Sequence, residues 1–537
     1  MMDKKINGTK KEYVWMVVLS VIALFPNIFF LFYGNKALLA ALFLFALSCL
    51  FYLLPCLFLR KRVFFIIQGI FVLLAPLEAA HIYLNRMPAT AAFLLSIIDT
   101  NQEESFELLS AIKFPLVILF LFWAFYFFIV FVRIKNTCLF KSNLTKWIGV
   151  PVFVGMIITG YATGYNKEIY PYSLMFRTYQ VFAAKKEIKA GREKMKNFRF
   201  NAVKKDTVYE KEVYVFVIGE TGRYSSYSIN GYRRNTSPML EKTENLVSYT
   251  DFHSEANITT SSLPVILTRA SALDYERSYV EKSFVDAFKE AGFKTYWIAY
   301  QSANNQFIRR ISGDADKEYF RVPHFSDTAN FDEQLWPYLD DVLAGNDRKA
   351  LIVIHTLGSH FRYNYRYPAS FEVFSPSLKG AFDYALISAK NKEMFVNTYD
   401  NSILYTDFFL AGTIRKIDSL QAVSTLVYVA DHGENLFDTE ANIVFHGGSE
   451  YTPYDFHVPF FVWTSDKYNI RYPSKVENLN RNKDKKLSTH YIFYSMLDMA
   501  GITFPEQISD RSIVSETLRE DSIRYILNTN MEVQKGF

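Results

Sequence analysis

The chain has 537 residues, of which 50% are hydrophobic, and its formal net charge at pH 7 is +5. This length exceeds that of a single ordinary domain. The hydrophobic residues are concentrated in the first part of the chain, which excludes a wholly soluble protein, whereas the remainder has the composition of a soluble domain.

Five apolar stretches in the first part are long enough to cross a bilayer, which takes about 20 helical residues. The first stretch is too long for the apolar region of a signal peptide and has no convincing small-residue cleavage site, so we interpret it as an anchor. The predicted spans are Tyr13–Tyr33, Ala37–Leu59, Val63–Leu84, Phe114–Ile134 and Trp147–Thr163.

Basic residues predict the orientation of these spans. Three basic clusters fall on one side of the membrane if five helices alternate, and an excess of Lys and Arg marks the cytoplasmic side. The chain after residue 165 is therefore expected outside the cytoplasm. The same clusters supply much of the positive net charge: Lys4, Lys5, Lys10 and Lys11; Arg60, Lys61 and Arg62; and Arg133, Lys135, Lys141 and Lys146.

The three cysteines lie outside the exported part of the chain. Cys49 and Cys56 fall in a predicted span, and Cys138 falls in a cytoplasmic loop. This excludes both a disulfide scaffold and thiolate metal ligands in the exported domain. That domain has roughly 330 residues, which is ample for a stable hydrophobic core.

Two segments connect the spans to each other and to the exported domain. In the outer loop, the spacing from Thr100 to Glu103 and Glu104 suits the start of a helix, and a capped surface helix is the simplest interpretation. After the last span, the basic stretch from Ala183 to Lys196 predicts a helix. It could lie along lipid headgroups, or it could be a solvated linker.

From residue 207 onward, short apolar runs alternate with helical patterns such as Val280–Ala291 and Val396–Ile417. This alternation favours an α/β fold in which helices cover both faces of a sheet. The predicted strands are Val213–Ile218, Lys294–Ala299, Ala350–His355, Thr425–Ala430 and Val458–Trp463.

Acidic and imidazole side chains directly follow two of these strands. Glu220 comes after the first strand, and Asp431 and His432 come after the fourth. In an open parallel sheet, ligands gather at the carboxyl ends of the strands. Glu, Asp and His are ligands that Zn²⁺ or a similar dication takes. The sequence therefore predicts a metal-dependent site at this edge of the sheet.

The hydroxyl-rich segment Asn257–Pro264 precedes a predicted helix. A helix N-terminus offers free amides and a positive dipole end, which suit an anion such as phosphate. A Thr hydroxyl at this place is a weak nucleophile unless a base or a metal activates it. By itself, the segment is more typical of an ordinary Ser/Thr helix cap.

Several histidines lie near the predicted strand ends. His360 follows the third strand, His446 lies soon after the Asp-His pair, and His457 precedes the last strand. His355 closes a strand and is compatible with a core position. The remaining histidines have no convergent context in the sequence: His81, His253, His324 and His490.

Several short motifs follow one another in a fixed order along the chain. They are Val217–Arg223, Asn230–Tyr232, Thr236–Pro238, Thr259–Pro264, His355–His360 with Arg366–Pro368, Asp431–Glu434 and Phe445–Gly447. In order and spacing they closely resemble the phosphoethanolamine transferases that decorate lipid A, including the mobile colistin-resistance enzymes. These belong to the alkaline phosphatase/sulfatase superfamily. The loop Thr100–Glu104 also resembles the periplasmic loop of that family.

The resemblance implies a membrane-anchored α/β protein. Five N-terminal transmembrane helices are expected before an α/β/α sandwich of the alkaline phosphatase/sulfatase type. The implied domains are a transmembrane domain over residues 1–164, interfacial linker helices over residues 165–206, and an extracytoplasmic metal-dependent catalytic domain over residues 207–537. The protein would be a monomer in the bacterial inner membrane, with this last domain in the periplasm.

The resemblance also implies roles for individual residues. Glu220, Thr259, Asp431 and His432 would hold one Zn²⁺ ion. Thr259, five residues before Pro264, would be the nucleophile, with Thr260 as the alternative. The remaining implied residues contact substrate: His360 and His446 would bind the phosphoryl group or a second metal ion, and Asn101 and Glu104 would help to form the pocket for the ethanolamine lipid.

The implied reaction transfers phosphoethanolamine in two steps. Thr259 would attack the phosphorus of phosphatidylethanolamine and release diacylglycerol, and a lipid A phosphate would then accept the group. Polymyxin resistance would follow from the reduced negative charge of the lipid. The expected partners are therefore the donor lipid, lipid A or another envelope acceptor, and membrane lipids, with no nucleic acid.

The chain departs from well-known family members in lacking their disulfides, which weakens any inference about the acceptor. A core sugar, another glycan or a protein remains open as acceptor. A glycerol-phosphate transferase of the lipoteichoic acid type is a second alternative, although Gly219-Glu-Thr and Asn230-Gly-Tyr favour ethanolamine transfer. A sulfatase activity lacks its Cys/Ser-x-Pro-x-Arg motif around Pro264. A non-catalytic envelope protein with a structural metal is the remaining alternative.

Overall fold

The computed structural model describes residues 2–34, 36–91, 94, 113–139, 143–204, 210–301, 312, 315–323, 330–379, 386–440, 442–448 and 450–537. The chain divides into two compact units. One comprises Met1–Ile98, Ser105–Lys185 and Gly448–Glu450, and the other comprises Asp99–Glu104, Lys186–Gly447 and Tyr451–Phe537.

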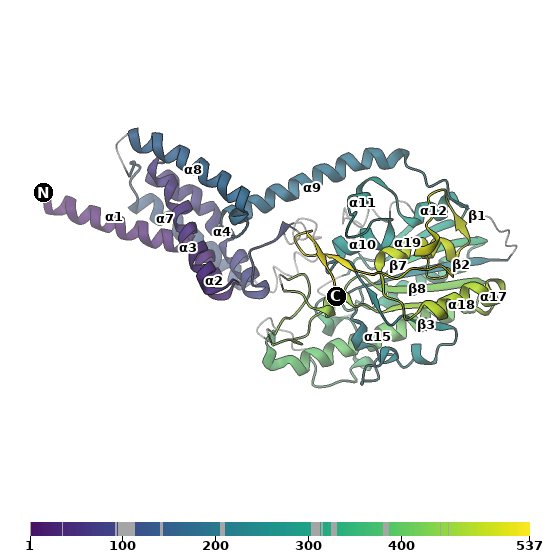
Figure 1. Ribbon diagram of the computed structural model, residues 1–537. Coiled ribbons are helices and arrows are strands. Elements are labelled where there is room, and N and C mark those ends of the chain that lie inside the picture. Colours follow the sequence, from purple (N-terminus) through teal and green to yellow (C-terminus); the bar gives the residue numbers. More distant parts are fainter. Residues whose placement is uncertain are drawn as a thin grey trace. The chain divides into compact units, whose positions relative to one another are not determined.

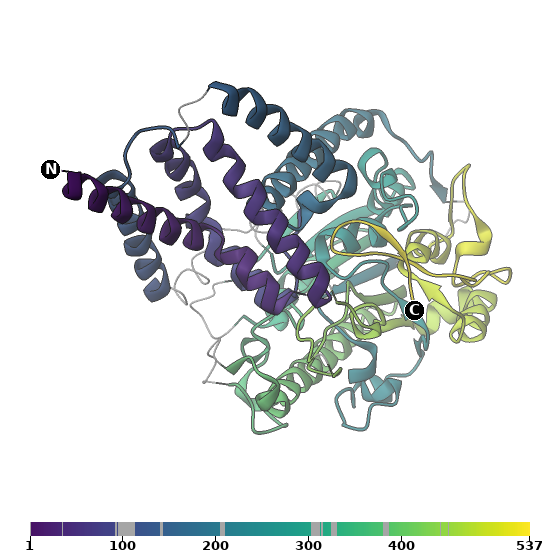
Figure 2. The ribbon, with the colours of Figure 1, turned by 60° about the vertical axis from the view of Figure 1, so that its left-hand side comes forward.

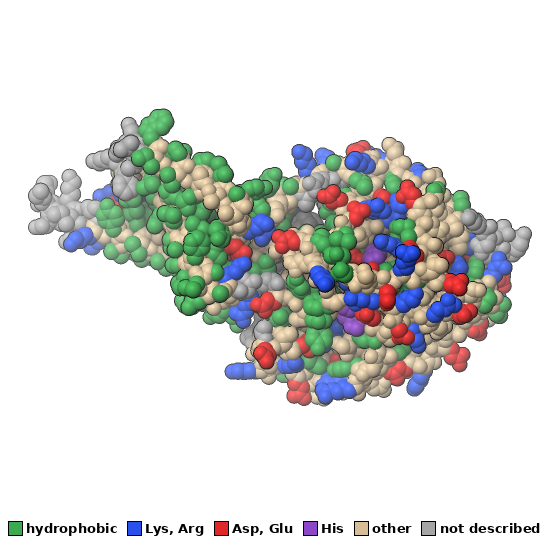
Figure 3. All heavy atoms as spheres, viewed as in Figure 1, with side chains coloured by type: hydrophobic (Ala, Val, Ile, Leu, Met, Phe, Trp, Pro, Cys, Tyr) green, Lys and Arg blue, Asp and Glu red, His purple; other side chains and the backbone are tan. Residues whose placement is uncertain are grey.

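The first unit is helical. A hydrophobic core that includes Leu19, Phe65 and Tyr126 joins α1, α4 and α7. Many other apolar side chains of these helices are exposed, and they cover the surface of the unit (Figure 3). Such a surface is suited to lipid. The helices are α1 (Met2–Ala23), α2 (Phe25–Tyr33), α3 (Leu38–Leu53), α4 (Lys61–Asn85), α7 (Lys113–Arg133), α8 (Asn143–Thr163) and the first half of α9 (Tyr172–Asn197).

Within the described residues, two helical segments are long and apolar enough to cross a membrane, Leu38–Leu57 and Lys61–Tyr83. Lys10–Ala23 and Phe25–Tyr33 make a third if this pair, bent by 50°, is one span. The described apolar parts of the two remaining helices, Val117–Arg133 and Trp147–Thr163, are shorter. The five predicted spans thus stay a prediction.

The second unit is built on a seven-stranded sheet with strand order β3-β9-β8-β2-β7-β5-β6. Strands β8, β2, β7, β5 and β6 are parallel to one another. Figures 1 and 2 show these strands between layers of helices. The strands are β2 (Glu212–Gly219), β3 (Leu246–Ser248), β5 (Lys294–Ala299), β6 (Lys317–Phe320), β7 (Lys349–His355), β8 (Val423–Ala430) and β9 (Phe460–Thr464).

Alternate side chains of the central strand β2 enter two different cores. Tyr214, Phe216 and Ile218 join the core on one face, and Val213, Val215 and Val217 join the core on the other. This follows from the two-residue period of a strand that is buried on both faces. The first core is completed by α10 (Thr259–Leu267), α12 (Phe284–Glu290) and α19 (Ile492–Met499), and the second by α14 (Trp336–Leu343) and α15 (Lys392–Asp418).

Strands β3 and β6 were not predicted from the sequence, and two predicted elements differ in the structure. Strand β9 is antiparallel to β8, because the described chain between them returns from the end where β8 finishes and forms only the short helix α16 (Pro453–Phe456). A parallel neighbour would need a crossover, usually a helix packed on the sheet, that carries the chain back to the opposite end. The helix predicted over Val280–Ala291 is divided into α11 (Arg277–Val280) and α12.

Candidate metal centre

The register of two neighbouring strands brings the predicted ligands together. Strands β2 and β8 are parallel, and Gly219 pairs with Ala430 at their carboxyl ends. The next residues along the two strands, Glu220 and Asp431, therefore begin at the same edge of the sheet. One ligand atom each from Glu220, Asp431 and His432 lies within 4.8 Å of the others, and all three residues are buried. The predicted convergence is thus present in the fold.

Thr259 is the first residue of α10 and faces this cluster. Its Oγ1 lies 3.2 Å from Glu220 Oε2 and 3.4 Å from His432 Nε2. The residue that caps α10 is Ile258, which has extended backbone and makes no side-chain cap. The hydroxyl of Thr259 therefore contacts the acidic cluster and does not cap its own helix, whose first amides lack partners within the helix.

The donor atoms fit a divalent cation. Asp431 Oδ1 accepts hydrogen bonds from the amides of Thr221 and His432, at 3.1 and 2.8 Å. Asp431 Oδ2 is buried, faces His432 Nε2 at 3.4 Å, and has no well-formed hydrogen bond among the described residues. A buried carboxylate oxygen without such a partner is costly unless a cation is near. Two carboxylates, an imidazole and a hydroxyl are suitable ligands for Zn²⁺.

Protonation in the cluster is shared between three buried groups. Burial disfavours charge on Glu220, but contact with His432 holds the pKa of Glu220 well below its usual range. Burial and the charge of Glu220 raise the pKa of Asp431 to about 7. Burial opposes protonation of His432, yet Asp431 and Glu220 together raise the pKa of that imidazole to about 10. A metal ion binding here would displace a proton from the imidazole.

The backbone around Glu220 is unusually constrained. Thr221 has a φ of 58°, which is rare for a β-branched residue. Its hydroxyl donates to Glu220 Oε1 at 2.8 Å. Gly358 also has a positive φ of 50°, and a Cβ there would lie 2.8 Å from the backbone nitrogen of Glu220. Strained backbone of this kind often occurs at functional sites.

Two further histidines predicted from the sequence lie at the same site. The ring centroids of His446 and His432 are 3.9 Å apart, and His446 Nδ1 lies 3.2 Å from Glu434 Oε1. Glu434 also accepts a hydrogen bond of 2.6 Å from Tyr363, so the carboxylate orients His446. His360 is near enough for its charge to affect Glu220, and burial lowers the pKa of His360 to about 4.

The other predicted residues have different outcomes. His355 is buried against Trp297 in the sheet, as expected for a core residue. Asn101 and Glu104 lie outside the described residues. Glu434 was predicted only as part of a motif, and no signal in the sequence indicated the contact between Tyr363 and Glu434.

A second cluster of possible metal ligands escaped the sequence analysis. Asp251, His253 and His457 have ligand atoms within 4.8 Å of one another. Their proximity depends on the single bridge between His253 and His457, which local patterns do not reveal. However, Arg524 Nη2 lies 2.7 Å from Asp251 Oδ1, so an added cation would meet an existing positive charge.

The protein-family model for sulfatases matches residues 212–502. The chain belongs to the sulfatase family. The matched residues include β2, β8 and every ligand of the cluster described above. The match therefore covers most of the α/β unit, including the residues of the candidate metal centre.

Curated relatives specify the resemblance further. The chain is 30% identical over 331 residues to phosphoethanolamine transferase EptC of Escherichia coli K12, covering 59% of this chain and 56% of the relative. It is 30% identical over 310 residues to the Kdo(2)-lipid A phosphoethanolamine 7''-transferase of the same strain, covering 54% and 52%. The predicted resemblance to phosphoethanolamine transferases is confirmed. The chain spans about half the length of these relatives.

Solved structures support the fold. The periplasmic domain of the E. coli EptC in complex with Zn has a TM-score of 0.55 at 28% identity, covering 61% of this chain and 92% of that one. The integral membrane lipooligosaccharide phosphoethanolamine transferase A (EptA) of Neisseria meningitidis has a TM-score of 0.75 at 21% identity, covering 95% and 99%. The second likeness shows that the fold matches along nearly the whole chain.

Proposed function

We propose that this protein is a zinc-dependent phosphoethanolamine transferase that uses phosphatidylethanolamine as donor and a lipid A phosphate as acceptor. The observation that carries the proposal is the Thr259 hydroxyl, 3.2 Å from Glu220 in a buried carboxylate–imidazole cluster. The names of the relatives, which include a lipid A phosphoethanolamine transferase, support the substrate class.

The residues of the cluster have distinct roles in this proposal. Glu220, Asp431, His432 and Thr259 would hold the Zn²⁺ ion. When bound, the ion would lower the pKa of the Thr259 hydroxyl and polarise a phosphoryl oxygen. Glu220 accepts a hydrogen bond from Thr259 and so orients the nucleophilic oxygen. The N-terminus of α10 presents amides and a positive dipole end to the phosphate.

The transfer proceeds in two steps. Thr259 Oγ1 gives up its proton and forms a bond to phosphorus, the bond from phosphorus to the diacylglycerol oxygen breaks, and the diacylglycerol oxygen takes up a proton. An oxygen of the lipid A phosphate then attacks the same phosphorus, the bond to Thr259 breaks, and Thr259 Oγ1 regains a proton. His360 and His446 lie beside the cluster, where their ring N–H groups can donate hydrogen bonds to phosphoryl oxygens.

The membrane arrangement suits two lipid substrates. In the proposal, residues 1–164 form five spans with the N-terminus in the cytoplasm, residues 165–206 connect them to the catalytic domain, and residues 207–537 lie in the periplasm at the bacterial inner membrane. Donor and acceptor then share one bilayer surface, which helps to orient both. Asn101 and Glu104 remain the proposed contacts for the ethanolamine lipid.

The connector supports this arrangement. Met175, Tyr179 and Phe182 recur at helical spacing on α9 and are exposed. Lys194 and Lys196 lie in the last turn of the same helix. Exposed apolar residues near one end of a helix suit contact with lipid, and basic residues suit contact with anionic headgroups.

Mass spectrometry of the protein incubated with phosphatidylethanolamine tests the proposal. One phosphoethanolamine mass should appear on the peptide that contains Thr259, and the Thr259→Ala variant should show neither the adduct nor release of diacylglycerol. An adduct on Thr260 or Thr221 would contradict the assignment of the nucleophile. A Thr259→Ala variant with full turnover would contradict the covalent mechanism.

The acceptor needs a separate experiment. Expression in a polymyxin-susceptible Gram-negative host should add one phosphoethanolamine mass to lipid A. It should also raise polymyxin tolerance, because the modification reduces negative surface charge. If a core sugar, glycan or protein gains the group while lipid A does not, the proposed acceptor is wrong and the transferase activity stands.

A further inference from the structure

The last hairpin of the chain consists of β12 (Tyr525–Leu527) and β13 (Val533–Lys535), joined by a tip that we define as Asn528–Glu532. The tip is held by its own hydrogen bonds. The side-chain oxygen of Asn528 accepts from the amides of Asn530 and Glu532, at 2.9 and 3.0 Å. This turn is therefore formed independently of any substrate.

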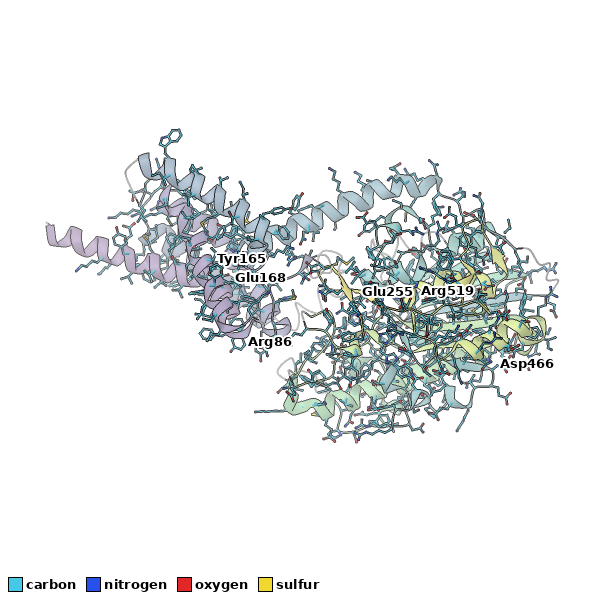
Figure 4. All side chains as sticks on the ribbon, in the orientation of Figure 1. Arg86, Tyr165, Glu168, Glu255, Asp466 and Arg519 are labelled. Carbon is cyan, nitrogen blue, oxygen red and sulfur yellow. The ribbon has the colours of Figure 1, made fainter. Side chains whose placement is uncertain are left out.

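The base of the hairpin is firmly attached to the catalytic unit. The amide of Leu527 donates to the carbonyl of Glu255 at 2.7 Å, and Leu527 forms a parallel bridge with Ala256. Arg524, whose side chain is 3% exposed, pairs with Asp251 at 2.7 Å. The Glu255 side chain, labelled in Figure 4, bonds in turn to His490. Loss of one contact at the tip would leave these attachments in place.

The tip contacts two segments that carry proposed site residues. Thr529 Oγ1 donates to the carbonyl of Gly447 at 3.0 Å, and Gly447 directly follows His446. Ser261 Oγ, in the first turn of the helix that begins at Thr259, lies 3.1 Å from Met531 Sδ. The hairpin thus joins the histidine segment to the helix of the nucleophile.

The segment Phe445–Gly447 is held from two sides. On one side, the amide of Phe445 donates to the carbonyl of Asn435 at 2.9 Å, and the Asn435 side chain donates to the carbonyl of Phe445 at 2.7 Å. On the other side is the bond from Thr529. Phe445 has a positive φ of 66°, which is strained for a residue other than glycine, so the segment needs support from its neighbours.

We propose that Thr529 is a positioning residue for phosphoryl transfer. By fixing the carbonyl of Gly447, it sets the place of the His446 ring relative to the hydroxyl of Thr259. The inference rests on the proposed function for its catalytic consequence, since His446 is there expected to contact the phosphoryl group. Residues that orient groups around a metal centre typically change activity by about 10–100-fold when they are lost.

The test compares Thr529→Val, which keeps the shape and removes the donor, with Thr529→Ser, which keeps the hydroxyl. Thr243→Val is the matched control, because the exposed Thr243 hydroxyl makes one bond to a backbone carbonyl, at 2.9 Å from Met239. Full-length protein in vesicles that contain both phosphatidylethanolamine and lipid A is assayed for kcat and KM of diacylglycerol release. Hydrogen exchange of the peptide that contains His446 is measured in parallel.

Thr529→Val should lower kcat by about 10-fold or more with little change in KM, and it should speed amide exchange at Phe445–Gly447. Thr529→Ser should keep both the kcat and the amide exchange near the wild-type values. Thr243→Val should match the wild type in both measurements. The inference is overturned if Thr529→Val keeps the wild-type kcat and exchange, or if Thr243→Val loses as much activity. If the wild type releases no diacylglycerol, the proposed function fails, and the exchange comparison still decides whether Thr529 positions the histidine segment.

Discussion

Replacing Gly358 by alanine perturbs the backbone of Glu220 without touching a ligand atom. A Cβ at this position would lie 2.7 Å from the backbone oxygen of Glu220 and 2.8 Å from its nitrogen, whereas ordinary contacts begin at 3.4 Å. To reach ordinary contact distance, the backbone of Glu220 or of residue 358 must move by about 0.7 Å. Catalytic groups need placement to within about 0.5 Å.

Gly358→Ala has two effects, the close contact with Glu220 and the cost of a side chain in left-handed backbone. An alanine variant at a second glycine with positive φ separates them. Gly358 has a φ of 50°, and a side chain in left-handed backbone costs roughly 1–2 kcal/mol. Gly292 has a φ of 86° and nothing within 4 Å of its Cβ position, so Gly292→Ala carries the backbone cost alone. Each 1 kcal/mol should lower the melting temperature by about 2–4 °C.

We therefore expect Gly358→Ala to lose activity far beyond its loss of stability. Since a misplacement of about 1 Å can cost on the order of 100-fold in rate, diacylglycerol release should fall by about 10–100-fold, while Gly292→Ala stays near the wild-type rate. Melting is followed by differential scanning fluorimetry of the purified proteins. If Gly358→Ala retains full activity, or if both variants lose activity equally, close packing of Gly358 against Glu220 does not position the metal centre.

Three further predictions concern the metal, pH and topology. Glu220→Gln and Asp431→Asn should each abolish transfer and lower the zinc content measured by mass spectrometry, and full activity in chelator-treated protein would exclude the metal role. Burial lowers the pKa of His457 from 6.5 to about 4, so the unfolded chain binds a proton at this residue more readily than the folded protein does. The neutral His457 side chain therefore contributes its full stability above pH 6.5, and this stability is lost as the pH falls towards 4. His457→Phe should flatten the fall in melting temperature over that window, and an unchanged pH profile would contradict this. A reporter that is active only outside the cytoplasm should be active when fused after Phe537 and inactive when fused at Lys141. The opposite pattern would contradict the proposed orientation.

Much of the catalytic unit could be predicted from the sequence because the relevant signals are local. Short β-branched runs predict buried strands, and helical patterns between them predict a layered α/β fold. Once β2 and β8 are placed in a parallel sheet, general topology brings Glu220 and Asp431 to one edge. The place of Thr259 at the start of a helix is equally a local property of the segment before Pro264.

Other features were decided only by the tertiary structure. The antiparallel direction of β9 depends on the return path from β8, and the contact of Met531 with Ser261 joins residues 270 positions apart. Asp251 and His457 likewise meet only through strand pairing. Sequence periodicity shows which side chains are buried, whereas hydrogen-bond partners depend on register and on the path of distant segments. The sequence by itself therefore determined the elements and the ligand types of this site, and packing between distant segments decided how the surrounding residues hold them.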